Sequence, residues 1–73
     1  PMTVIEFSLP KESRATIRIF DARGFLVDTP FNGVAHEGMN TLTWNARDRA
    51  SGVYFYQLTA GGIVETRKMM LLK

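Results

Sequence analysis

Alternation of apolar and polar residues is the main pattern along this chain, and it predicts β-strands. Apolar side chains fall on every second position over Thr3–Leu9, Ala15–Phe20 and Met39–Asn45. A period of two places successive side chains on opposite faces, as in a strand with one buried face. Pro10 ends the first of these segments, because proline has no amide hydrogen to donate to a central ladder.

Two further strands are predicted towards the carboxyl end. Val53–Thr59 begins with VYFY, which is apolar on both faces and typical of a central strand covered on both sides. Ala60–Gly62 is a short hairpin loop, and it delivers Ile63–Leu72 beside that strand. We therefore expect these two strands to be antiparallel neighbours.

The middle of the chain is predicted to be less regular. Asp21 and Gly24 fit the first and fourth positions of a type I turn, and Phe25–Val27 is a short third strand. Residues 28–39 show no sustained period, so we expect a long connection between two sheets. Residues 46–52 are polar and predict a turn. About six short strands with frequent turns favour an all-β sandwich or a small barrel.

Length, cysteine content and charge narrow the functional classes. A chain of 73 residues forms one small domain, which needs nearly all of its apolar side chains for the core. The absence of cysteine excludes disulfides, thiolate zinc sites and thiol nucleophiles. Charges balance over residues 1–62, so the net charge of +2 comes from Arg67, Lys68 and Lys73 against Glu65. A nucleic-acid-binding domain usually spreads a larger basic excess over one face, so no nucleic-acid partner is predicted.

Candidate catalytic chemistry is sparse. His36 is the single histidine, and no nucleophile with an orienting carboxylate accompanies it, so we interpret it as an exposed loop residue. Neither Ser13 nor Ser51 lies in a nucleophile elbow. The aspartates do not have the spacing of a calcium loop. We therefore expect no enzymatic activity, no cofactor, no metal and no small-molecule substrate.

Aromatic residues suggest a second class of function. Trp44 is in phase with Leu42 on an apolar face, so we interpret it as a core residue. A carbohydrate-binding module would instead expose Trp44 or Tyr56 on a flat face. A structural spacer would need neither residue to be exposed.

The carboxyl-terminal segment ETRKMMLLK carries an apolar tetrad between basic residues. One interpretation is a closing strand, with Met69 and Leu71 in the core and Met70 and Leu72 on the other face. The alternative is an exposed strand that a partner extends by edge addition, including a second copy in an edge-strand dimer. The two interpretations do not exclude each other.

Several segments carry a resemblance to a known family. The run ASGVYFYQLTAGGIVETRKMMLLK resembles the end of the C-terminal sorting domain, type A, of the bacterial type IX secretion system. TVIEFSLP, ATIRIFDARGFLV and LTWNARDRASG resemble earlier parts of that domain in the same order. The chain also begins with proline instead of methionine. We therefore expect residues 1–73 to be a single carboxyl-terminal domain excised from a larger secreted protein.

The resemblance implies an immunoglobulin-like antiparallel β-sandwich of about six to seven short strands without chemistry of its own. It implies a signal that directs the parent protein through the periplasm and across the outer membrane of Bacteroidetes-like bacteria, to the cell surface or the medium. The implied partners are the type IX secretion machinery and the upstream domains of the parent. Carried over by position, the recognition candidates are Gly52, Tyr54, Lys68, Met69, Leu71, Leu72 and Lys73.

An alternative resemblance leads to a different function. The chain is also similar to the immunoglobulin-like part of flagellar-hook capping proteins and to fibronectin-type spacers of extracellular enzymes. Such a domain would be structural, or it would bind a carbohydrate or a protein through its loops. The sorting signal is the preferred hypothesis, because the SGVYFY segment and the basic-apolar ending are specific to that family.

Overall fold

The computed structural model describes residues 2–72, which form six strands and no helix. The described residues therefore contain no helix that could cross a membrane. In chain order the strands are β1 (Met2–Leu9), β2 (Ser13–Asp21), β3 (Leu26–Ala35), β4 (Gly38–Asn45), β5 (Gly52–Ala60) and β6 (Ile63–Leu71).

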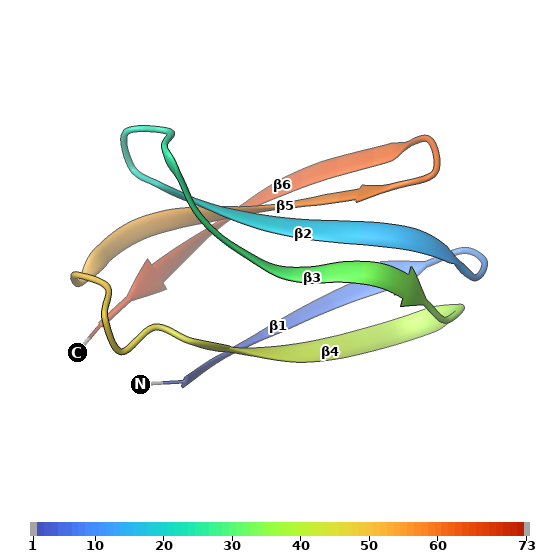
Figure 1. Ribbon diagram of the computed structural model, residues 1–73, viewed down its shortest axis with the longest axis horizontal. Coiled ribbons are helices and arrows are strands. Elements are labelled where there is room, and N and C mark those ends of the chain that lie inside the picture. Colours follow the sequence, from blue (N-terminus) through green and yellow to red (C-terminus); the bar gives the residue numbers. More distant parts are fainter. Residues whose placement is uncertain (1, 73) are drawn as a thin grey trace.

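The strands form two facing sheets of unequal size (Figure 1). One sheet has the order β1-β4 and the other the order β3-β2-β5-β6, and every pairing is antiparallel. The chain crosses between the sheets after β1, after β3 and after β4. This arrangement confirms the predicted immunoglobulin-like antiparallel sandwich, with six strands in the described part of the chain.

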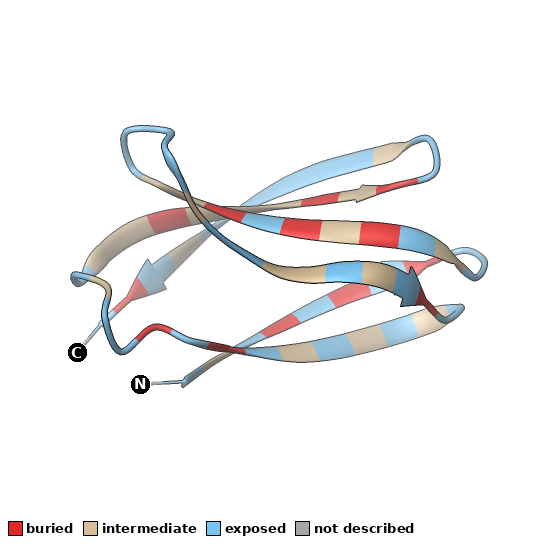
Figure 2. Cartoon of the chain, viewed as in Figure 1, coloured by how far each residue is buried: buried red, intermediate tan, exposed pale blue. Residues whose placement is uncertain are grey.

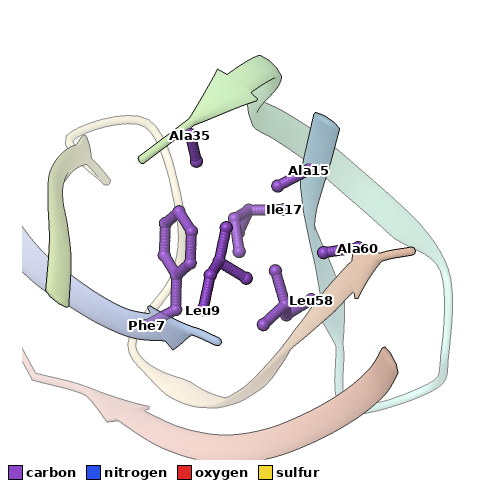
Figure 3. Close-up of a cluster of buried hydrophobic side chains, with 7 residues drawn as sticks. All are labelled: Phe7, Leu9, Ala15, Ile17, Ala35, Leu58 and Ala60. Carbon is purple, nitrogen blue, oxygen red and sulfur yellow. The ribbon is translucent and has the colours of Figure 1, made fainter. Parts of the chain in front are cut away.

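The core lies between the two sheets, where alternate side chains of facing strands meet. Buried and more exposed positions alternate along β1 and β2, as their sequence pattern predicts (Figure 2). Ile17 and Ile19 in the middle of β2 have no exposed surface. Figure 3 shows the cluster at one end of the core, to which β1, β2, β3 and β5 contribute Phe7, Leu9, Ala15, Ile17, Ala35, Leu58 and Ala60.

The second core cluster contains the aromatic residues that the candidate site requires. Its buried members are Ile5, Ile19, Trp44, Ala46, Tyr54 and Leu71. Trp44 is only 3% exposed, which confirms the prediction that it is a core residue. This cluster also joins the last residue of β6 to the two-stranded sheet, because it contains both Leu71 of β6 and Ile5 of β1.

The prediction of a long connection over residues 28–39 is wrong, and so are the bounds of the short third strand. Most of this segment belongs to β3, which begins at Leu26 and leaves only residues 36 and 37 between β3 and β4. Ile17 pairs with Phe31 but Ile19 pairs with Asp28, so β3 bulges and loses its sequence alternation. Pro30 is tolerated because β3 is an edge strand of its sheet.

The expectation for β5 is confirmed in one respect and wrong in another. β5 lies between β2 and β6, so it is a central strand, as predicted. Its face with Val53 and Phe55 is half-buried, however, because the two-stranded sheet covers only the opposite face, where Tyr54 is buried. The apolar run VYFY therefore marks a strand covered by a sheet on one side only.

The turn between β2 and β3 is held by a single carboxylate. One Asp21 oxygen accepts hydrogen bonds from the amides of Arg23 and Phe25, at 2.9 and 3.0 Å. The Gly24 amide donates to the Asp21 carbonyl at 3.0 Å, and Gly24 has a φ of 93°, which favours glycine. These bonds confirm the predicted turn.

We predict that acid weakens this turn. Desolvation raises the pKa of Asp21, but the hydrogen bonds from Phe25 and Arg23 outweigh it and hold the pKa below the ordinary value of an aspartate. A lowered pKa in the folded state adds stability above the unfolded pKa, and this stability is lost as the pH falls through the folded value. The difference in free energy of unfolding between the wild type and Asp21→Asn should therefore shrink below about pH 4.

Urea unfolding at several pH values, followed by Trp44 fluorescence, measures this difference. A difference that stays constant from neutral to acid pH would contradict the role given to the Asp21 carboxylate.

Candidate recognition site

The Gly52 and Tyr54 pair forms a corner between the loop after β4 and the start of β5. The Tyr54 hydroxyl donates a hydrogen bond to the carbonyl of Ala50 at 2.7 Å, four residues upstream. Gly52 has a φ of 147°, which side chains other than glycine rarely adopt. A tyrosine bonded back to the preceding loop is the tyrosine corner of immunoglobulin-like sandwiches. The Gly-x-Tyr spacing therefore has a structural reason.

The ring of Tyr54 connects this corner to the rest of the core. It lies edge-on against Trp44, with ring centroids 5.8 Å apart and an interplanar angle of 67°. The Trp44 indole nitrogen donates to Asp28 Oδ2 at 2.7 Å, and Arg49 donates to the Val27 carbonyl at 2.8 Å. These contacts tie β5 to β4 and to β3 across the sandwich.

Two candidates from the basic-apolar ending point into the core. In the β5–β6 ladder, Met69 pairs with Tyr54 and Leu71 pairs with Gly52. Leu71 is 4% exposed, and Met69 is half-buried against the same cluster. These two side chains therefore anchor the end of β6 at the tyrosine corner, as the closing-strand interpretation predicts.

The residues that alternate with these two face away from the core or are exposed. Lys68 pairs with Phe55 and Met70 pairs with Val53, on the face of the larger sheet that no second sheet covers. Met70 is 60% exposed, and Leu72, just after β6, is 76% exposed. The remaining candidate, Lys73, lies outside the described residues.

An apolar surface, which we call the outer patch, includes Met70 and borders Lys68. It consists of Phe20, Leu26, Val53, Phe55 and Met70, and their pairings place it across β3, β2, β5 and β6. Leu26 pairs with Phe20, and Phe20 pairs with Phe55, so these three residues form one transverse row that ends at Lys68. Val53 and Met70 pair with each other in the neighbouring row. The sequence candidates did not include these five residues. The alternation of MMLL could have identified Met70, but Phe20 and Leu26 join the patch only through strand order.

A groove opens on the opposite face, between β1 and β6. It has a volume of about 470 Å³, and Tyr56, Glu65 and Arg67 contribute to its lining. The groove exists because the two-stranded sheet leaves the inner face of β6 uncovered at Glu65 and Arg67, whereas it covers Met69 and Leu71. There a guanidinium nitrogen of Arg67 lies 4.0 Å from Glu65 Oε1, and both side chains are more than half exposed.

The described residues provide little for catalysis or metal binding. Residues 2–72 contain no group of three histidine or carboxylate side chains placed to hold a metal ion. His36 is exposed between β3 and β4, as expected, with Nδ1 2.8 Å from the Glu37 carbonyl oxygen. Trp44 is buried, so it offers no platform to a sugar.

Comparison with known proteins shows the family to which this fold and these residues belong. The family model of the secretion system C-terminal sorting domain matches residues 2–72. The chain belongs to this family. No curated protein and no solved structure matches the chain at the significance required. The family match spans all six strands, so the outer patch and the tyrosine corner both lie within the sorting domain.

The sorting domain is a signal for type IX secretion. Domains of this class are generally non-catalytic, and their partner is the type IX secretion machinery. The parent of such a domain is secreted or associated with the cell surface. The resemblance stated from the sequence is therefore confirmed, whereas the roles of its individual residues rest on the geometry above.

We predict that the hydroxyl and the ring of Tyr54 contribute separately to the free energy of unfolding of the sorting domain. Tyr54→Phe removes the bond to the Ala50 carbonyl and should lower the free energy of unfolding by about 1 kcal/mol. Tyr54→Ala also removes the contact with Trp44 and should cost about 3–5 kcal/mol. Urea unfolding measures both values. Equal stabilities for Tyr54→Phe and the wild type would show that the corner bond contributes nothing.

Proposed function

We propose that the secretion machinery reads the sorting signal as a folded surface, made of the outer patch together with Lys68 and Leu72. One observation carries this proposal: the basic-apolar ending divides by face. Met69 and Leu71 point into the core, whereas Lys68 and Met70 point outward beside Phe55 and Val53. A linear peptide would present both groups alike, but a strand presents only one of them to a partner.

The inward candidates have a positioning role in this proposal. Gly52 and Tyr54 form the corner at which β5 begins, and Leu71 packs in the same core cluster as Tyr54. These residues fix where β6 ends and therefore where Lys68 and Met70 lie. Substitutions in this group act on recognition through the shape and stability of the domain.

The outer patch indicates the chemistry of the partner surface. Its outermost residues, Leu26 and Met70, are 55% and 60% exposed, which is high for large apolar side chains that lie together on one face. Lys68 ends the apolar row, and Arg18 lies on the same face with Gln57 as its neighbour on β5. A complementary partner would present apolar side chains with carboxylates at the border.

The signal would act as one part of a larger parent protein. We propose that residues 1–73 act as one carboxyl-terminal domain of a larger protein, whose upstream domains are the cargo. The cargo would pass through the periplasm before it crosses the outer membrane, and it would then be released or attached to the surface. The description of the matching family as a C-terminal sorting domain supports this arrangement. Lys73 would extend the basic character of the ending.

We predict that Met70→Ser reduces export, whereas Val64→Ser does not. Both residues lie on the outer face of β6 and are exposed to 60% and 63%, but only Met70 belongs to the outer patch. Loss of one apolar contact of the patch should lower export about tenfold. The measurement compares extracellular and periplasmic amounts of a reporter joined ahead of the domain, in a bacterium with a type IX system.

Because the two variants lose similar exposed surface on one strand, a general effect on β6 would reduce export in both. Equal export of the two variants would therefore contradict the outer patch as the recognition surface. Intact domain recovered from the periplasm shows whether a retained reporter is folded.

We predict a specific charge effect at Lys68. Lys68→Glu replaces the positive charge at the end of the apolar row, and a partner with carboxylates at its border should then be repelled. Export should fall, whereas Lys11→Glu in the exposed turn before β2 makes the same charge change and should leave export unchanged. The same reporter assay measures both. Normal export of Lys68→Glu would show that the partner border is not acidic.

A further inference from the structure

The free edge of β6 carries a charge pattern that is complementary to itself. β6 is the last strand in the order β3-β2-β5-β6, so within residues 2–72 no strand pairs with its outer edge. Unpaired edges readily accept a further strand. Four side chains alternate along the inner face of this edge, in the order Ile63, Glu65, Arg67 and Met69.

This order of side chains is complementary to the same order in a second copy that runs in the opposite direction. Two copies of a strand that pair antiparallel about a two-fold axis place residues equally far from the axis opposite each other. With Thr66 on the axis, Glu65 faces Arg67 of a second copy, and Arg67 faces Glu65. The same register places Ile63 opposite Met69, so the charged pairs lie between two apolar pairs. Cross-strand pairs of these kinds stabilise antiparallel sheets.

Neighbouring registers lose this match. An axis at Glu65 sets two carboxylates opposite each other, and an axis at Arg67 sets two guanidinium groups opposite each other. Like charges in directly opposite positions destabilise a sheet. Inward-facing charges on an edge also discourage unrelated strands. The Glu65 and Arg67 pair therefore selects one partner strand and one register.

The other free edges of the described strands lack such a pattern. Pro30 interrupts β3, whose edge therefore lacks an amide donor at that position. β1 carries one charge, Glu6, for which a second β1 offers no basic partner. β4 has no charged side chain to set a register.

We propose that β6 pairs with β6 of a second copy of this chain, antiparallel and centred on Thr66, so that two larger sheets become one continuous sheet. This inference goes beyond the sorting function, because it concerns association between copies of the domain. Lys68 then faces Val64 of the second copy, and both outer patches lie on the same face of the joined sheet. The contact is small, so we expect dissociation constants from about 1 μM to about 1 mM.

We predict that charge reversal at either position abolishes the dimer and that mixing restores it. Glu65→Arg alone sets arginine opposite arginine, and Arg67→Glu alone sets glutamate opposite glutamate. A mixture of the two variants sets opposite charges against each other at both positions and should form a heterodimer. Sedimentation velocity over the expected concentration range measures all three samples and the wild type.

The mixed sample also controls for folding, because misfolded variants would not recover by mixing. A wild type that stays monomeric throughout the range would overturn the proposal. Single variants that dimerise like the wild type, or a mixture that stays monomeric, would overturn it as well. None of these results depends on export, so a failure here leaves the proposed recognition surface intact.

Cysteine crosslinking tests the register directly, because the chain contains no cysteine of its own. Thr66→Cys places two thiols opposite each other at the axis, within reach of a disulfide. Val64→Cys is the matched control on the same face, and its two thiols would lie about 13 Å apart along the strands. Oxidation should therefore give a covalent dimer for Thr66→Cys alone. Equal crosslinking of both variants would overturn the register.

Discussion

The domain covers a four-stranded sheet with a two-stranded one, and this inequality determines which side chains are available to other molecules. The smaller sheet buries the inner face of β2 and much of β5, where Ile17, Ile19 and Tyr54 lie. It covers the end of β6 at Met69 and Leu71 but not the middle of that strand, so Glu65 and Arg67 remain in an open groove. The outer face of the larger sheet has no covering layer, which leaves Met70 and Leu26 exposed.

The sequence predicts the strands where each residue obeys a local rule. Period-two alternation identifies β1, β2 and β4, and the glycine hairpin places β6 beside β5. β3 escapes prediction because its bulges put successive apolar residues out of phase, and because Pro30 is acceptable only on an edge strand. Edge position is a property of the whole sheet, so no local pattern contains it.

The candidate site was also predictable from the sequence only in part. The family resemblance identifies Gly52, Tyr54 and the basic-apolar ending, and alternation predicts which residues of that ending face inward. The role of Tyr54 requires the position of the Ala50 carbonyl, which depends on the path of the loop. Phe20 lies far from Phe55 in the sequence and becomes its neighbour only through the β2–β5 ladder. The outer patch was therefore not predictable from adjacent residues.

The pairing of β5 with β6 also bears on the order of events during synthesis. The outer patch is assembled from four strands, and β6 is the last of them to leave the ribosome. A nascent chain without β6 has neither Met70 nor the Leu71 anchor, and its β5 lacks one neighbour. The proposed recognition surface therefore forms only after translation has passed through β6, so a chain that stops before β6 would lack it.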